Sequence, residues 1–235
     1  MESTWTLIAN GQFADAVRAV EGAMISKGGS SAASAMEFNH LWTARMLMGD
    51  VAAAREAARR GDEAEQHKSS YLLNRLGISQ WLLGDREEAL ANWVRAFEAP
   101  YQDIAGGLSP LMFQVFGAVY LGDQRRRQAA HRELGRMAKR ARGSTAWPLP
   151  LASYLTGAMD DAGLAEAHRA AGGRPPLPQR YMVQACFARA VLARERGEWD
   201  AVARAREEAL ALQPPGVYLE NEYFMLRCWN GWCDR

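Results

Sequence analysis

"LLNRLGISQWLLGDREEALANWVRAFEAP", residues 72–100, carries two apolar stripes that are joined at Gly84-Asp85. Apolar side chains recur every three to four positions on both sides of this turn, a spacing typical of amphipathic helices. Glycine can end a helix in the left-handed conformation, and an acid behind it can cap the next helix. Neither helix can bury its apolar face alone, so the stretch predicts a helical hairpin that packs against similar units.

The same turn signal recurs along the chain at intervals of 35 to 40 residues. It is a glycine followed by an acid or its equivalent, at Gly11-Gln12, Gly49-Asp50, Gly122-Asp123 and Gly197-Glu198, with a looser case at Gly157. No segment shows the alternation of a half-buried strand. The sequence therefore predicts an all-α protein of about six antiparallel helix pairs.

These features resemble the tetratricopeptide repeat, a helix pair of about 34 residues. The repeat 72–100 matches its pattern best, with Leu76-Gly77, Gly84-Asp85, Ala89, Trp93, Ala96 and Pro100 at or beside the expected places. The resemblance implies a right-handed superhelical α-solenoid that binds other proteins. The last stretch, "GVYLENEYFMLRCWNGWC" (216–233), is expected to form one helix that caps the final pair.

We expect residues 1–235 to form a single solenoid with a joint at 172–179. The joint is rich in proline, which stiffens a linker, and it would separate an N-terminal lobe (1–171) from a C-terminal lobe (180–235). A second connector, rich in glycine and serine, covers 24–34.

Composition narrows the classes of function. Lys+Arg 28 against Asp+Glu 27 leaves a formal net charge of +1, so no global field attracts nucleic acid or a membrane. No targeting signal or membrane-spanning run is visible, and three cysteines do not suggest a disulfide framework. We expect a cytoplasmic protein, and the preference for arginine and alanine points to a bacterial source.

No catalytic or cofactor motif stands out. Phosphate-binding glycine loops, the nucleophile elbow and zinc-protease spacings are absent, and no two of His40, His67, His131 and His168 are spaced four residues apart. We therefore predict a non-enzymatic protein with no cofactor and no metal. An enzyme is the third alternative, and it would use Glu220, Glu222 and Tyr223 with a distant histidine.

The strongest charge feature is an arginine-rich helix predicted at 124–142. Only Glu133 opposes its cations, so the helix is either a solvated face or a patch for an acidic protein or RNA. An acidic protein is favoured because no aromatic residues interleave with the basic ones. The candidate contacts are Arg125, Arg126, Arg132, Arg136 and Arg140.

A second candidate surface is the concave groove that the first helices of such repeats line. Asn39 and Asn74 recur at the same place in two repeats, and an amide in a groove can bond a peptide backbone. Whether Trp42, Trp81 and Trp93 belong to this groove or to the core stays open. The predicted groove residues are Asn39, Met46, Tyr71, Asn74, Trp81, Met112, Phe116, Phe187 and Arg194.

Together these patterns favour a scaffold that grips another protein. Among such proteins we favour a neutralising partner that looks like a bacterial immunity protein, which binds and neutralises a cognate toxin domain. The alternatives are an adaptor or secretion chaperone, and a regulator that binds a peptide or RNA through helix 124–142. A protein partner is expected rather than nucleic acid or a membrane, and the oligomeric state is open.

Overall fold

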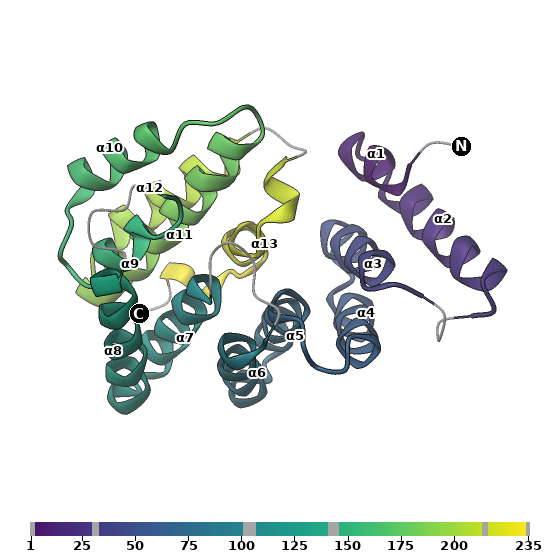
Figure 1. Ribbon diagram of the computed structural model, residues 1–235, viewed down its shortest axis with the longest axis horizontal. Helices are drawn as coiled ribbons and strands as arrows, with labels where there is room; N and C mark the ends of the chain where they lie inside the picture. The colour runs from purple at the N-terminus through teal and green to yellow at the C-terminus, as the bar shows by residue number, and fades with distance from the viewer. Residues whose placement is uncertain (1–2, 30–32, 101–106, 141–145, 213–215, 234–235) are drawn as a thin grey trace. The chain divides into compact units, whose positions relative to one another are not determined.

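A computed structural model describes residues 3–29, 33–100, 107–140, 146–212 and 216–233. Within these ranges the chain forms thirteen α-helices and two short 3-10 helices, and no residue is in a strand (Figure 1). The all-α prediction is confirmed, and chain neighbours pack as pairs. The superhelical solenoid stays a prediction.

The chain divides into two compact units, Met1–Gln102 and Asp103–Arg235, called unit 1 and unit 2 below. The predicted joint at 172–179 falls inside unit 2. There α10 ends at Ala171 and α11 begins at Leu177, with a proline in its first turn.

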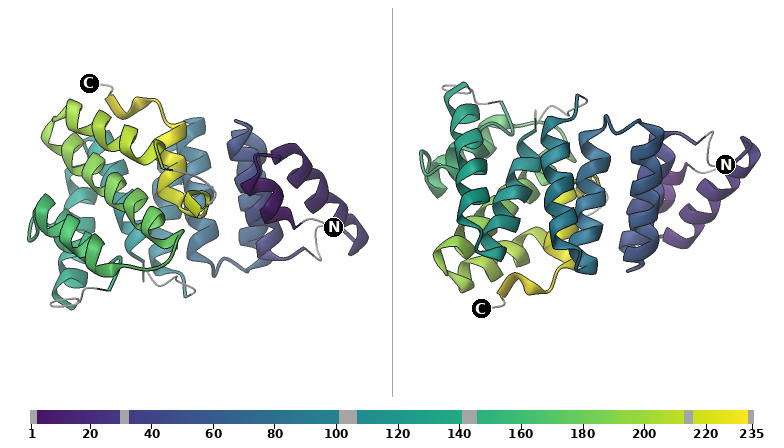
Figure 2. Two further views of the ribbon diagram at one scale, coloured as in Figure 1. Left: turned by 90° about the horizontal axis from the view of Figure 1, so that it is seen from above. Right: turned by 90° about the horizontal axis from the view of Figure 1, so that it is seen from below.

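Unit 1 consists of three helix pairs that follow one another along the chain. Each pair contacts the next, because α2 packs on α3 and α4 packs on α5 (Figures 1 and 2). The pairs are α1 (Thr4–Ala9) with α2 (Phe13–Ser26), α3 (Ala35–Leu47) with α4 (Val51–Ala64), and α5 (Ser70–Leu83) with α6 (Arg86–Glu98).

The glycines predicted to end helices have the positive φ of the left-handed conformation. Gly84 ends α5 with a φ of 96°, a conformation that costs glycine nothing because it lacks Cβ. The other five behave alike, namely Gly11, Gly49, Gly122, Gly157 and Gly197. The turn prediction is confirmed at all six places.

Capping by the residue behind the glycine is confirmed only in part. The Asp50 side chain accepts from the Ala53 amide at 3.1 Å and caps α4. Asp85 makes no capping bond, and its carboxylate lies 3.3 Å from the Arg55 guanidinium instead. The acid at this position can therefore serve a neighbouring helix rather than its own.

Tryptophans fill the core of unit 1. The Trp42 indole donates to the Ser79 hydroxyl at 2.9 Å, which joins α3 to α5. The rings of Trp81 and Trp93 lie 5.5 Å apart between α5 and α6. Trp42, Trp81 and Trp93 are all fully buried, so they are core residues.

Unit 2 contains three further helix pairs and a closing segment. The pairs are α7 (Leu108–Leu121) with α8 (Gln124–Arg140), α9 (Pro150–Leu155) with α10 (Asp161–Ala171), and α11 (Leu177–Arg196) with α12 (Trp199–Leu210). Helix α11 packs against α7, α9, α10 and α12. Unit 2 therefore departs from a linear stack, in which a pair contacts only its neighbours.

The end of the described chain is not the single helix that the sequence predicts. It forms three short pieces, and α11 and α12 pack against them. The helix breaks at Trp229, whose backbone is extended at the end of α13. This backbone lets the indole pack against two aromatic rings of α7, with ring centroids 4.8 Å from Phe116 and 5.0 Å from Tyr120. The pieces are η2 (Gly216–Leu219), α13 (Asn221–Cys228) and η3 (Gly231–Cys233).

Candidate functional site

Six of the nine predicted groove residues are buried in the two cores rather than exposed on an open face. In unit 1 they are Met46, Asn74 and Trp81, and in unit 2 they are Met112, Phe116 and Phe187. The physical reason is that hairpins pack on both sides of a first helix. Apolar residues at helical spacing on such a helix are therefore core residues, although the same spacing would also suit a groove.

The other three groove residues contact their own unit. The Asn39 carbonyl accepts from the Arg75 guanidinium at 2.7 Å, and the Tyr71 hydroxyl also bonds Arg75. Arg194 donates to the backbone carbonyls of Gly231 and Trp232, so it secures the closing segment. Their role in partner binding stays a prediction.

The five arginines predicted on the basic helix are all exposed. Four of them, Arg125, Arg132, Arg136 and Arg140, are spaced by seven, four and four residues along α8. A helix turns about 100° per residue, so these four lie within a sector of about 80°. We call them the basic stripe. Arg126 lies beside it, with its guanidinium 3.4 Å from Asp123. The predicted helix ended at 142, and its last two residues lie outside the described residues.

The opposite side of α8 packs against the rest of unit 2. Ala130 and Leu134 are buried there. Arg127 and His131 reach Glu195 of α11 at 3.1 Å and 3.8 Å. The stripe thus faces away from the anchored side.

Little inside the described chain neutralises the stripe. Arg136 pairs with Glu133, its neighbour on the same helix. Arg125, Arg132 and Arg140 form no hydrogen bond or ion pair with any described residue. Their donors are therefore available to an outside anion.

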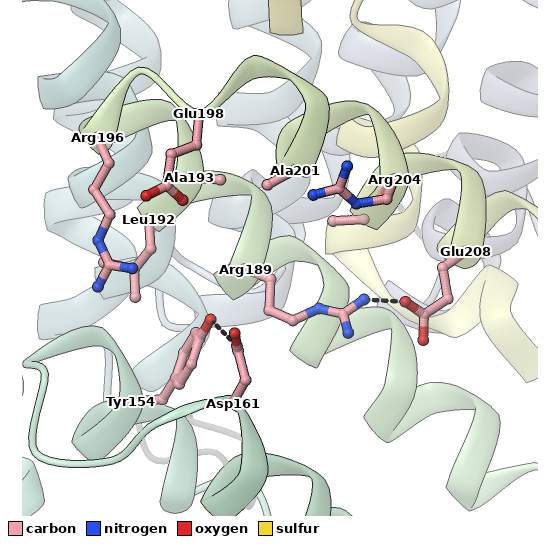
Figure 3. A pocket seen from close by; sticks show the side chains of 11 residues that line it. Tyr154, Asp161, Arg189, Leu192, Ala193, Arg196, Glu198, Ala201, Arg204 and Glu208 are labelled. Atoms are coloured by element: carbon pink, nitrogen blue, oxygen red, sulfur yellow. Dashed lines mark hydrogen bonds and ion pairs between the residues drawn. The ribbon is translucent and has the colours of Figure 1, made fainter.

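Unit 2 contains a cleft that the sequence does not predict (Figure 3). We call it the Arg cleft. It has a volume of about 320 Å³ and lies where α9 and α10 meet the hairpin of α11 and α12. Its polar lining is Tyr154, Asp161, Arg189, Arg196, Glu198, Arg204 and Glu208.

Two internal pairs set the electrostatics of the Arg cleft. The Tyr154 hydroxyl donates to Asp161 at 2.6 Å, and Arg189 pairs with Glu208. Burial, and then the bond to Asp161, raises the pKa of Tyr154 well above its ordinary value of 10.0. Tyr154 is therefore neutral and remains a donor at neutral pH.

Two cations of the Arg cleft are not paired. Arg196 and Arg204 are exposed, and neither bonds another described residue. The buried Nε of Arg189 also has no partner. The sequence contains weak signals for this site, such as the seven-residue spacing of Arg189 and Arg196, but Tyr154 and Asp161 come from a different helix pair.

Cys186 contacts a residue of the cleft, because its sulfur lies 3.6 Å from the Arg189 guanidinium. Burial raises the pKa of this thiol to about 12, so it stays protonated at neutral pH. A protonated thiol is a poor nucleophile. Cys186 therefore acts as a packing group.

The acids named for an enzyme alternative are buried in polar contacts. Glu220 accepts from Arg180 and, at 2.8 Å, from the Gln184 amide, while Glu222 accepts from the Ser109 hydroxyl. These contacts tie α13 to α11 and α7. No cluster of described histidine, cysteine and acid side chains could hold a metal ion.

Comparisons with protein-family models, with curated proteins and with solved structures find no match for this chain. Among the described residues no helix is both long and apolar enough to span a bilayer.

Proposed function

We propose that this chain is a non-enzymatic, tetratricopeptide-like scaffold that binds an acidic protein through the basic stripe of α8. Its most specific form is a bacterial immunity-type protein, which acts in the cytoplasm by binding and neutralising a cognate toxin domain. The observation that carries the proposal is the stripe itself. Three of its four guanidiniums have no partner within the described chain.

Charge and geometry support a protein partner of this kind. Arginine presents planar donors that match carboxylates bidentately. The stripe runs over sixteen residues of helix from Arg125 to Arg140, and these two ends are about 22 Å apart at the helical rise. A row of that length fits an acidic helix or loop, and it would speed association by electrostatic steering.

The proposal has two competitors with different signatures. An adaptor or secretion chaperone would release its client, whereas a neutralising protein would hold its toxin at a stable ratio. An RNA-binding regulator would lose affinity steeply with salt, by about one unit of log–log slope per phosphate contacted.

A capture experiment tests the proposal. Three baits are needed: the wild type, a stripe variant (Arg125→Gln, Arg132→Gln, Arg140→Gln) and a control variant (Arg18→Gln, Arg55→Gln, Arg59→Gln). Both variants lose three exposed positive charges, but the control changes lie in unit 1. Bound material from the source organism is identified by mass spectrometry.

We expect one acidic protein on the wild-type and control baits and much less of it on the stripe variant. Expressed alone, that protein should arrest growth, and co-expression of the wild-type chain should restore growth. Equal capture by all three baits would overturn the assignment of the stripe. Recovery of RNA would favour the regulator.

A further inference from the structure

The Arg cleft is not used by the proposed function, and it has the dimensions of a small-molecule site. Its volume of about 320 Å³ lies in the usual range of ligand pockets, roughly 300–1,000 Å³. A second, shallower hollow of about 600 Å³ shares Tyr154, Asp161 and Arg196 with it. The cleft is thus open to solvent along the turn between α9 and α10.

The unpaired charges of the cleft have both signs. Arg196 and Arg204 have unused donors, and each guanidinium carries five N–H groups. The Glu198 carboxylate also forms no hydrogen bond or ion pair with a described residue. Asp161 accepts one bond, from Tyr154, and keeps further acceptor capacity.

The presence of both positive and negative side chains in the cleft favours one class of ligand over others. A phosphate would meet the two arginines but also the acids at positions 161, 198 and 208. A simple cation would meet the acids but also Arg196 and Arg204. A molecule with one carboxylate and one ammonium satisfies both sets at once.

The wall of the cleft also accommodates an apolar group. Leu192 and Ala193 are buried and line it between charged side chains (Figure 3), and the buried Ala205 also belongs to its lining. An aliphatic side chain placed there would be partly removed from water, which favours binding.

We infer that the Arg cleft is a binding site for a small zwitterion of the α-amino-acid class. Because Arg196 and Arg204 lie at opposite ends of the cleft (Figure 3), one of the two holds the carboxylate, an acid of the cleft (Glu198 or Asp161) accepts from the ammonium, and the side chain lies on the wall at Leu192. This site is independent of the basic stripe and goes beyond the proposed function.

Two-dimensional NMR of the arginine Nε–Hε groups tests the inference. The common L-α-amino acids are titrated one at a time into the full chain up to millimolar concentration. At least one should shift the signal of one or both of Arg196 and Arg204 and reach saturation. Its N-acetyl form lacks the ammonium and its amide form lacks the carboxylate, so each should bind at least tenfold more weakly.

Variants assign the binding to the cleft. The double change Arg196→Gln, Arg204→Gln should weaken binding at least tenfold. The matched change Arg169→Gln, Arg174→Gln, at exposed arginines of the same unit, should leave it unaltered. Circular dichroism confirms that both variants fold.

Three results would overturn the inference: no saturable shift with any amino acid, equal binding of the N-acetyl and amide forms, or unchanged binding by the cleft variant. The stripe variant should bind the amino acid as the wild type does. If no amino acid binds the cleft, the proposed function of the stripe is unaffected. If the stripe binds no acidic protein, the inference about the cleft is likewise unaffected.

Discussion

Trp93 lies so close to Gly77 that a methyl group at Gly77 would be 2.7 Å from Cδ1 of the indole. The contact joins α5 to α6, and it explains why the residue after Leu76 is a glycine. The indole is fully buried and tilted against Trp81, so it has little room to move.

Gly77→Ala should therefore destabilise the protein. Overpacking of a core costs about 1–3 kcal/mol, and the better helix propensity of alanine offsets only part of that. Urea unfolding followed by circular dichroism measures the change. Gly135→Ala on α8 is the matched control, because nothing lies within 4 Å of its Cβ position. It should leave stability unchanged or raise it by up to about 1 kcal/mol.

A buried chain of hydrogen bonds in unit 2 gives a second prediction. The Trp147 indole donates to Gln184 at 2.7 Å, and the Gln184 amide donates to Glu220 at 2.8 Å. Gln184→Ala would leave buried groups unpaired, which should cost about 1–3 kcal/mol. Gln128→Ala, at an exposed position of α8, should change stability by less than about 0.5 kcal/mol. Similar melting temperatures for the two variants would contradict the role of Gln184.

The thiols of Cys186 and Cys228 should be unreactive in the folded protein. Burial raises the pKa of Cys186 to about 12 and also raises that of Cys228, so few thiolates form near pH 8. Iodoacetamide at that pH should label the peptides containing Cys186 and Cys228 far more slowly than in urea. Mass spectrometry of the digested protein follows each site separately. Rapid labelling of Cys186 without urea would show that its thiol is accessible and ionised.

Stability should fall as the pH rises above about 9. Burial raises the pKa of Cys186 and of Tyr154 above their ordinary values of 9.0 and 10.0. As the pH rises, the unfolded chain releases these protons at a lower pH than the folded chain does. The neutral groups therefore contribute fully to the free energy of unfolding below pH 9, and this contribution declines above it. Each group adds a slope of at most about 1.4 kcal/mol per pH unit.

Urea unfolding between about pH 8 and pH 11 measures this slope. Tyr154→Phe should flatten the curve above about pH 10, although it loses the bond to Asp161 at all pH values. A pH dependence identical to that of the wild type would mean that Tyr154 does not titrate as described.

The helices and turns could be predicted from the sequence because their causes are local. Gly84 ends a helix by its own backbone freedom, and the apolar spacing around it does not depend on distant residues. The sequence also identified Arg125, Arg132, Arg136 and Arg140 as exposed cations, because a run of cations with one opposing acid cannot be buried.

Tertiary packing decides what the sequence could not. Spacing does not tell which side of a first helix faces the next pair, so Phe116 and Phe187 were expected in a groove but lie in the core. The Arg cleft forms because Tyr154 and Asp161 lie close to Arg189, which belongs to a later helix pair. The local sequence around these residues does not predict that contact.

The affinity of the captured acidic protein for purified chains tests the central claim most directly. Isothermal titration at about 0.15 M salt compares the wild type, the stripe variant and the unit 1 control variant. We predict one binding site per chain, with the affinity reduced at least tenfold in the stripe variant and unchanged in the control. Equal affinity of the stripe variant and the wild type would contradict binding through α8.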